Sequence, residues 1–159
     1  MFDLTEPLDI EIKVFPEYRE LELPLPTYAT DGSNAVDFRA VFTDQSVWTI
    51  EPHTTVLIPS GIAVHIKNPN VALVLLPRSS FGHRMGMRLG NTIGLIDSGY
   101  QGQIFLSVRN CNDHDVSVQR GERIVQGMFV PIVRARFREV EEFEKSVRGE
   151  GGFGHSGRH

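Results

Sequence analysis

Residues 91–102 read Asn-Thr-Ile-Gly-Leu-Ile-Asp-Ser-Gly-Tyr-Gln-Gly, a glycine-punctuated turn between two apolar runs. Its glycines permit backbone conformations that residues with a Cβ avoid, and such turns join the strands of β-hairpins. The turn also carries one carboxylate, Asp97, and one aromatic ring, Tyr100. We therefore expect a hairpin that closes its backbone around a flat ligand.

The rest of the chain repeats this pattern of short apolar runs separated by turn residues, which is typical of an all-β domain. The strands that we expect are residues 10–15, 35–42, 47–50, 54–67, 71–76, 103–110, 116–119 and 123–138. Proline, glycine, asparagine and aspartate interrupt the runs at positions that suit turns. The best helical candidates are a short turn after Ser79 and the acidic run 139–145.

Length and composition predict one globular domain with a sizeable core, since the chain has 159 residues, of which 40% are hydrophobic and 23% charged. We place this domain at residues 1–147. No segment has the length and hydropathy of a membrane span or signal peptide, so we expect a cytoplasmic protein without a membrane partner. The single cysteine, Cys111, excludes an internal disulfide and a multi-cysteine metal site, and we expect it to be buried.

The formal net charge of −4 argues against nucleic-acid binding, because that affinity depends mainly on basic contacts to phosphates. A small phosphorylated ligand needs only local positive charge. The arginines that could supply it are Arg78, Arg84, Arg88, Arg123 and Arg148.

An apolar strand ends at residues 77–80, Pro-Arg-Ser-Ser. Ser79 can cap a short helical turn and leave backbone N–H groups and hydroxyls beside Arg78, which suits a phosphate. A plain polar turn after a core strand explains the same residues.

Two further polar residues have both a structural and a functional interpretation. Asp37 alternates with Arg39 on one face of a strand, so the two could form a solvent-facing ion pair, or Asp37 could hold a magnesium-bound water near a polyphosphate. Gln126 could be an ordinary strand residue or a donor to phosphate oxygens.

The last twelve residues, 148–159, are rich in glycine and alone predict a disordered tail. Arg148 and Phe153 allow a second interpretation. In that case the tail orders over a ligand through phosphate pairing and ring stacking.

Taken in order, five stretches resemble the five motifs of the trimeric dUTP pyrophosphatases, and the resemblance spans nearly the whole chain. The stretches are residues 35–40, 77–82, 91–102, 121–126 and 148–157. The resemblance implies a homotrimer of jelly-roll-like β-barrel subunits with one short helix, a flexible C-terminal lid and active sites shared between chains. It also implies hydrolysis of dUTP to dUMP and pyrophosphate with Mg²⁺ on the triphosphate. That reaction limits uracil incorporation into DNA and supplies dUMP for thymidylate synthesis.

The resemblance also implies roles for individual residues. Asp97 matches the general base that activates the attacking water, and Tyr100 matches the ring that lies under the deoxyribose. Arg148 corresponds to the γ-phosphate arginine, Phe153 to the aromatic that stacks on uracil, and Asp37 to the carboxylate near the metal's water shell. The uracil pocket matches Asn91, Leu95, Ile96 and Phe105, and the phosphate contacts match Arg78, Ser79, Ser80 and Gln126.

Some positions depart from the family pattern. Ala35 and Ser80 stand where the motifs usually have glycine, and Gly99 stands where many relatives carry a second acid. Ala35 would perturb the backbone near Asp37 if that position required a positive φ. Two alternatives stay open, namely a dCTP deaminase-like trimer and a nucleotide-binding regulatory trimer that has lost catalysis.

Overall fold

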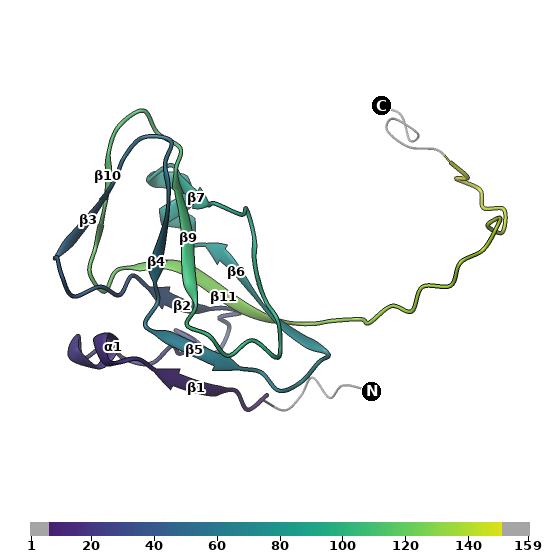
Figure 1. The fold of residues 1–159 in the computed structure, drawn as a ribbon, viewed down its shortest axis with the longest axis horizontal. Helices are drawn as coiled ribbons and strands as arrows, with labels where there is room; N and C mark the ends of the chain where they lie inside the picture. Colours follow the sequence, from purple (N-terminus) through teal and green to yellow (C-terminus); the bar gives the residue numbers. More distant parts are fainter. Residues whose placement is uncertain (1–6, 151–159) are drawn as a thin grey trace.

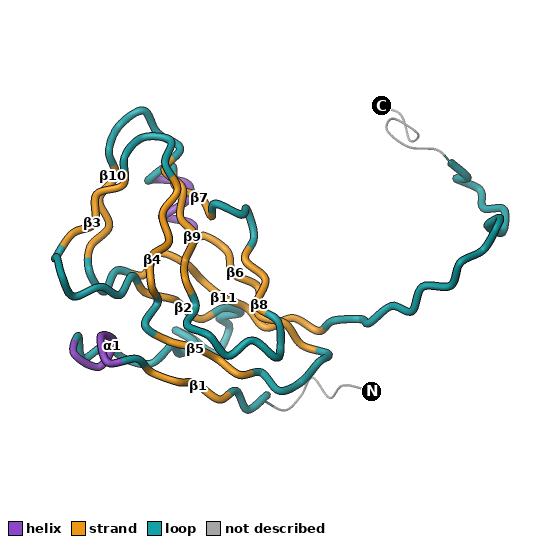
Figure 2. The backbone as a smooth tube through the Cα atoms, viewed as in Figure 1, coloured by secondary structure: helices purple, strands orange, loops and turns teal. Residues whose placement is uncertain are grey.

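All the strand pairs are antiparallel in the described part of the chain, residues 7–150 of a computed structural model. These residues form eleven short strands and two helices of five residues each. The strands wrap around one core, and the segment after the last strand leaves the domain (Figures 1 and 2). The all-β prediction is confirmed.

The largest sheet has four strands in the order β2, β11, β6 and β8. Their bounds are Val36–Arg39, Arg123–Pro131, Val71–Pro77 and Gly94–Ile96. The pairing of β11 with β6 runs from Val125 opposite Pro77 to Pro131 opposite Val71. This sheet brings the segments around residues 37, 78 and 126 together.

A second sheet has three strands in the order β4, β9 and β7, with bounds Thr55–Pro59, Phe105–Asn110 and Met87–Leu89. On β9 the side chains alternate between exposed or half-buried and buried positions, as the two faces of a strand require. Leu106 and Val108 point into the core, whereas Phe105 lies outside.

Two strand pairs and two short helices complete the domain. β1, Glu11–Val14, pairs with β5, Ile62–His65, and β3, Val47–Ile50, pairs with β10, Val116–Gln119. Helix α1, Pro16–Glu20, begins with proline at its first position, a signal that fits helix starts. The π-helix η1, Ser80–Arg84, lies where we expected a helical turn after Ser79.

The core lies between the sheets and draws on nearly every strand. Its largest fully buried side chains include Phe38, Ile50, Ile58, Leu73, Phe81, Leu106 and Ile124. Burying a side chain of this kind contributes about 1.5–3 kcal/mol. Among the described residues, no helix is long and apolar enough to cross a membrane.

Two predicted elements are wrong near the C-terminus. β11 stops at Pro131 rather than residue 138, because its partner β6 begins at Val71. Beyond that pair, Ile132 N still donates to the carbonyl of Asn70, but the ladder does not continue. The acidic run 139–145 is not helical, because an isolated helix this short needs packing that these exposed residues do not have. We call the described segment after β11, residues 132–150, the arm. The predicted domain boundary after residue 147 stays a prediction.

Two other expectations are also wrong. In the ladders of the described residues, β8 pairs with β6, and β9 pairs with β4 and β7. The expected hairpin is therefore a turn that joins two sheets. Cys111 is exposed rather than buried, because it follows the buried Asn110 at the end of β9 and so falls on the outward side of the alternation.

Candidate active site

The first group of site residues lies in one row across the four-stranded sheet. Gln126 on β11 is in register with Asp37 on β2 and with Leu76 on β6. β6 ends at Pro77, so the next residue, Arg78, leaves the sheet beside this row. Three motifs that are far apart in sequence thus meet at one end of the sheet.

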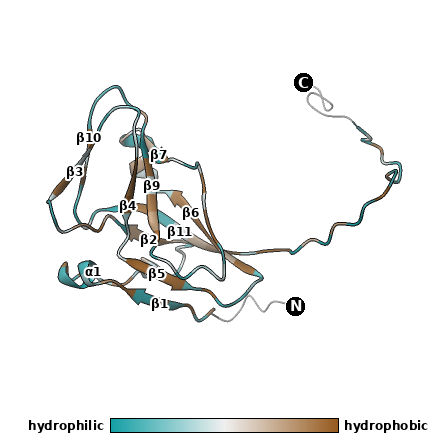
Figure 3. Cartoon of the chain, in the orientation of Figure 1, coloured by the Kyte–Doolittle hydropathy of each residue, from teal (hydrophilic) through white to brown (hydrophobic). Residues whose placement is uncertain are grey.

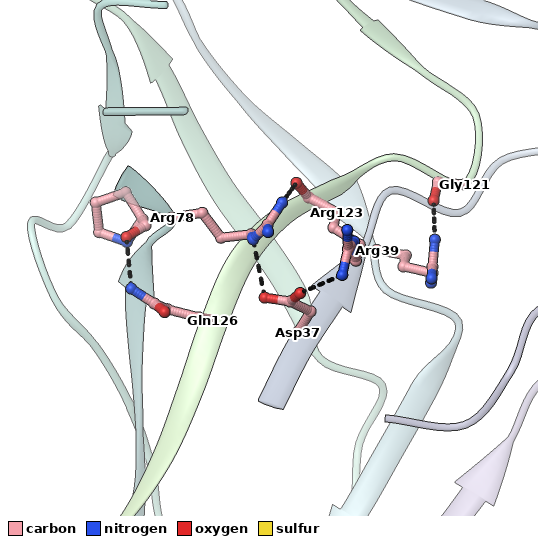
Figure 4. A network of polar contacts seen from close by, with 7 residues as sticks. Asp37, Arg39, Arg78, Gly121, Arg123 and Gln126 are labelled. Carbon is pink, nitrogen blue, oxygen red and sulfur yellow. Dashed lines mark hydrogen bonds and ion pairs between the residues drawn. The ribbon is translucent and has the colours of Figure 1, made fainter. Parts of the chain in front are cut away.

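Asp37 bridges two arginines in this group (Figure 4). Its Oδ1 accepts from Arg78 Nε at 2.9 Å, and its Oδ2 accepts from Arg123 NH1 at 3.1 Å. The expected pair with Arg39 does not form, because Arg39 NH1 donates to the carbonyl of Gly121 at 2.8 Å. We call Asp37, Arg78, Arg123 and Gln126 the arginine cluster.

Backbone groups also hold Arg78 in place. Its backbone N–H donates to the carbonyl of Ile124 at 3.3 Å, and its NH1 donates to the carbonyl of Arg123 at 3.1 Å. Next to it, Gln126 Nε2 donates to the carbonyl of Pro77 at 3.2 Å. The cluster thus presents guanidinium and amide donors at the end of β6. Phosphate oxygens accept hydrogen bonds from donors of this kind.

Ser79 and Ser80 follow Arg78 and are both exposed. Ser79 stands at the N-cap of η1, but its hydroxyl makes no capping hydrogen bond, so that part of the sequence interpretation is wrong. Its backbone is already helical, whereas a capping residue normally has extended backbone geometry.

The second group of site residues surrounds residues 97–104, which we call the Asp97 turn. Tyr100 N donates to the carbonyl of Asp97 at 3.0 Å, and Tyr100 Oη donates to the carbonyl of Gln103 at 2.9 Å. Gln101 Nε2 lies 3.2 Å from His65 Nε2 on β5. These contacts fix the turn while the Asp97 side chain stays exposed.

Apolar side chains beside the Asp97 turn are unusually exposed for a folded domain. Leu95 is 60% exposed and Phe105 is 48% exposed. Asn91 and Tyr100 are also exposed, and Ile96 is half-buried. Asp97 and Leu95 line a cavity of about 290 Å³ with Ile132 and Arg134 of the arm. This surface suits a ligand with a flat apolar ring and polar edges.

At Gly94 and Gly102 other side chains approach the backbone closely. These two glycines are not needed for a left-handed backbone, which is what the sequence interpretation had suggested. A Cβ on Gly94 would lie 2.9 Å from Leu75 Cβ, and one on Gly102 would lie 2.5 Å from Tyr100 Oη. Neither glycine has a positive φ, whereas Thr92 has φ 66°. Gly99 has open space around it, and Ala35 has no positive φ, so neither departure from the family pattern strains the backbone.

The structure therefore brings the predicted residues together in two groups rather than one. Asp37, Arg78 and Gln126 meet in the arginine cluster, with Ser79 and Ser80 beside it. Asn91, Leu95, Ile96, Asp97, Tyr100 and Phe105 belong to the segments around the Asp97 turn. Arg148 lies on the arm, and Phe153 lies outside the described residues.

Sequence reasoning assigned no specific role to Arg123, which the structure joins to Asp37. Its signal was weak, because an exposed arginine after a turn resembles any solvated charge. The described residues contain no cluster of three or more His, Cys, Asp or Glu side chains able to hold a metal ion.

Comparisons with known proteins show which family the chain resembles. The model of the dUTPase family matches residues 22–157. Deoxyuridine 5'-triphosphate nucleotidohydrolase from Escherichia coli K12 is 50% identical over 149 residues, which are 94% of this chain and 97% of that protein. The enzyme of the same name from Erwinia tasmaniensis is 49% identical over the same share of each chain.

Solved structures show the same fold. The dUTPase of Staphylococcus bacteriophage 80alpha superposes with a TM-score of 0.80 at 24% identity, covering 94% of this chain and 98% of that one. The dUTPase from Streptococcus mutans gives a TM-score of 0.67 at 27% identity, covering 79% and 98% of the two chains.

A jelly-roll-like β domain with a carboxylate-bearing turn and an arginine cluster defines a class of nucleotide hydrolases. Within that class, the family match covers most of the chain, and the relatives at about half identity span nearly its full length. The chain belongs to the dUTPase family.

Proposed function

We propose that the protein hydrolyses dUTP to dUMP and pyrophosphate, with Asp97 as the general base and the arginine cluster as the phosphate site. The observation that carries this proposal is the full-length likeness to dUTP nucleotidohydrolases, combined with an exposed Asp97 on a fixed turn. No observation favours the dCTP deaminase or the inactive regulatory trimer.

In this mechanism the Asp97 carboxylate accepts a proton from a water molecule as that water attacks the α-phosphorus. The water oxygen forms a bond to the α-phosphorus, and the bond from that phosphorus to the αβ-bridging oxygen breaks. Pyrophosphate leaves with the bridging oxygen. Arg78, Ser79, Ser80 and Gln126 donate to the phosphate oxygens and stabilise the negative charge of the transition state.

The Asp97 turn would select the base and the sugar. Leu95, Ile96 and Phe105 would enclose the uracil, with Asn91 and backbone groups at its polar edge. A base with the wrong donors would leave buried groups unpaired, and such sites discriminate by about 10⁴–10⁵. Tyr100 would occupy the space that a ribose 2′-hydroxyl needs.

Mg²⁺ is proposed to bind with the triphosphate, since it usually keeps several waters and binds through substrate phosphates. When bound, it neutralises part of the phosphate charge. The described residues offer no side-chain cage for it. The predicted role of Asp37 toward a metal-bound water stays a prediction, but its two oxygens both contact guanidinium groups, which repel a dication.

A homotrimer with shared active sites would join the two groups of residues. The arm gives this proposal its support, because Val133, Phe137 and Phe143 are 94%, 96% and 90% exposed in the single chain. Figure 3 shows brown apolar residues alternating with polar ones along the arm as it leaves the domain. Exposed apolar side chains gathered in one segment commonly mark a contact with another protein surface.

The domain also offers an apolar groove of about 540 Å³, lined by residues that include Leu8, Ile12, Leu25, Tyr28 and Phe129. We propose that the arm of a neighbouring copy packs on such a surface and delivers Arg148 and Phe153 to the substrate as a lid. The protein would then act in the cytoplasm, limiting uracil incorporation into DNA and supplying dUMP.

The test is pyrophosphate release from dUTP, dTTP, dCTP and UTP at equal concentration with Mg²⁺. We expect a strong preference for dUTP. Asp97→Asn should lower kcat by about 10²–10⁴ and leave binding of a non-hydrolysable dUTP analogue nearly unchanged. Asp113→Asn, which removes a carboxylate that pairs with His53 far from the turn, is the matched control.

Two results would overturn the proposal. Ammonia release from dCTP without pyrophosphate release from dUTP would indicate a deaminase. Unchanged turnover in Asp97→Asn would remove Asp97 as the general base.

A further inference from the structure

Arg123 lies at the start of β11, and an irregularity in the β11–β2 ladder decides where its side chain lies. The register pairs Arg123 with Arg39 and Val125 with Phe38, so Ile124 has no partner on β2. An extra residue of this kind is a β-bulge, which bends the strand and changes the direction of neighbouring side chains.

Without the bulge, Arg123 and Gln126 would lie on opposite faces, because side chains alternate along a regular strand. Instead, Ile124 and Val125 are adjacent in sequence and both fully buried. Arg123 therefore shares the face of Gln126 and reaches Asp37. A regular β11 would turn its guanidinium away from Asp37.

The bulge completes a closed ring of three residues. Arg78 Nε donates to Asp37 Oδ1 at 2.9 Å, and Arg123 NH1 donates to Asp37 Oδ2 at 3.1 Å. Arg78 NH1 donates to the Arg123 carbonyl at 3.1 Å. Each residue contacts the other two. Asp37 makes both of the side-chain contacts, whereas Arg78 binds Arg123 through its backbone carbonyl, which stays in place when the Arg123 side chain is changed.

The ring carries two positive charges and one negative charge, so it stays electropositive while Asp37 screens the repulsion between the arginines. The carboxylate is 24% exposed, which makes its contacts less screened by water than those of a surface pair. A guanidinium has five N–H donors, and the ring uses two of those on Arg78. The other donors can bind an anion from a fixed position.

We propose that Asp37 and Arg123 are positioning residues, which fix the Arg78 guanidinium for the triphosphate and act through Arg78 rather than through the water shell of a metal. This inference rests on the proposed function of the site. A donor that is already fixed needs no reorganisation when charge develops, and removing such a donor commonly costs about 10²–10³ in rate.

The experiment is a double-mutant cycle of Asp37→Asn and Arg123→Gln. Binding of the α,β-imido analogue of dUTP is measured by calorimetry in EDTA, and kcat, KM and the half-saturating Mg²⁺ concentration are measured with dUTP. Each single variant should weaken metal-free binding by about tenfold or more. The double variant should be no weaker than the weaker single variant, because both changes open the same ring.

Controls separate the ring from charge alone. Arg120→Gln and Asp44→Asn remove the same charges from exposed residues nearby in sequence, and both should behave as wild type. Arg123→Lys keeps a donor for Asp37 and should recover part of the binding. The half-saturating Mg²⁺ concentration should be the same in Asp37→Asn and wild type.

Additive losses of analogue binding in the cycle would show that Asp37 and Arg123 do not act through one ring. So would normal metal-free binding in Asp37→Asn combined with a raised Mg²⁺ requirement, which would place Asp37 at the metal. A wild-type protein that binds the analogue but releases no pyrophosphate would overturn the proposed function alone, since the metal-free cycle still tests the ring. A wild type that does neither would overturn both.

Discussion

The hydroxyl of Tyr100 lies against the backbone of Gly102, where an added Cβ would meet Oη at 2.5 Å. The same hydroxyl donates to the carbonyl of Gln103 at 2.9 Å. The ring thus folds back over the glycine and closes the Asp97 turn. Gly102 sets the position of the residue that we propose to select the deoxyribose.

Gly102→Ala should therefore change sugar selection. The added methyl group displaces the Tyr100 ring, so kcat/KM for dUTP should fall and the ratio of dUTP to UTP turnover should fall with it. Steady-state kinetics on both nucleotides measure the effect, with Gly99→Ala as the control in the same turn. A variant that keeps the wild-type ratio would show that the ring position does not set sugar selection.

Alanine variants of Gly94 and Gly99 form a matched pair for a test of the protein's stability. Gly94→Ala places a methyl group 2.9 Å from Leu75 Cβ, so β8 must move from β6 at a cost of about 1–3 kcal/mol. Gly99→Ala meets open space at an ordinary φ and should stabilise by about 0.4–1 kcal/mol. Thermal melting should shift in opposite directions, and equal shifts would contradict the geometry.

The contrast between these glycines shows what sequence could and could not predict. Apolar alternation predicted most strands, since the side-chain period of a strand is local information. The partner of β8 depends on contacts between distant segments, so the predicted hairpin was wrong although the turn was located correctly. A glycine can be required by a positive φ or by lack of room for a Cβ. For Gly94 and Gly102 the lack of room comes from the neighbouring Leu75 and Tyr100 side chains, which the sequence does not place.

The candidate site likewise contains residues that the sequence predicted and contacts that it did not. Asp37, Arg78 and Gln126 were found through their motifs, and the register of three strands brings them together. The predicted partner of Asp37 was wrong. Alternation suggested Arg39, whereas the bulge at Ile124 brings Arg123 to Asp37. Helix α1 was missed, although Pro16 at its first position and Glu17 in its first turn were a usable signal.

Because of Tyr18, we expect the stability of the folded protein to change at alkaline pH. Burial raises its pKa above the ordinary 10.0, and the nearby Arg39 opposes this in part. The folded state therefore holds the phenolic proton more tightly than the unfolded state. Its contribution is complete below pH 10.0 and is lost as the pH rises through the folded pKa.

Tyr18→Phe tests this effect. At neutral pH the variant should lose about 0.5–1.5 kcal/mol, because Tyr18 Oη donates to the carbonyl of Pro24 at 2.5 Å. Above pH 10.0 the stability difference between wild type and variant should shrink. Urea unfolding across this range measures it, and a constant difference would contradict a raised pKa.

The arm predicts how the subunits assemble. Phe137 and Phe143 are almost fully exposed in the single chain, so replacing them removes no packing from the isolated domain. In a trimer in which the arm packs on a neighbour, each buried phenylalanine contributes about 1.5–3 kcal/mol. The double variant Phe137→Ser and Phe143→Ser should therefore weaken assembly while each domain stays folded.

Sedimentation over a dilution series measures this effect, with Arg136→Ser and Glu141→Ser as a control that changes two exposed polar residues of the same arm. The control should remain trimeric at concentrations where the phenylalanine variant dissociates. Activity should fall with the trimer, because we propose that each active site is shared between chains. Equal dissociation of the two variants, or a wild type that is active as a monomer, would show that the arm does not join the subunits.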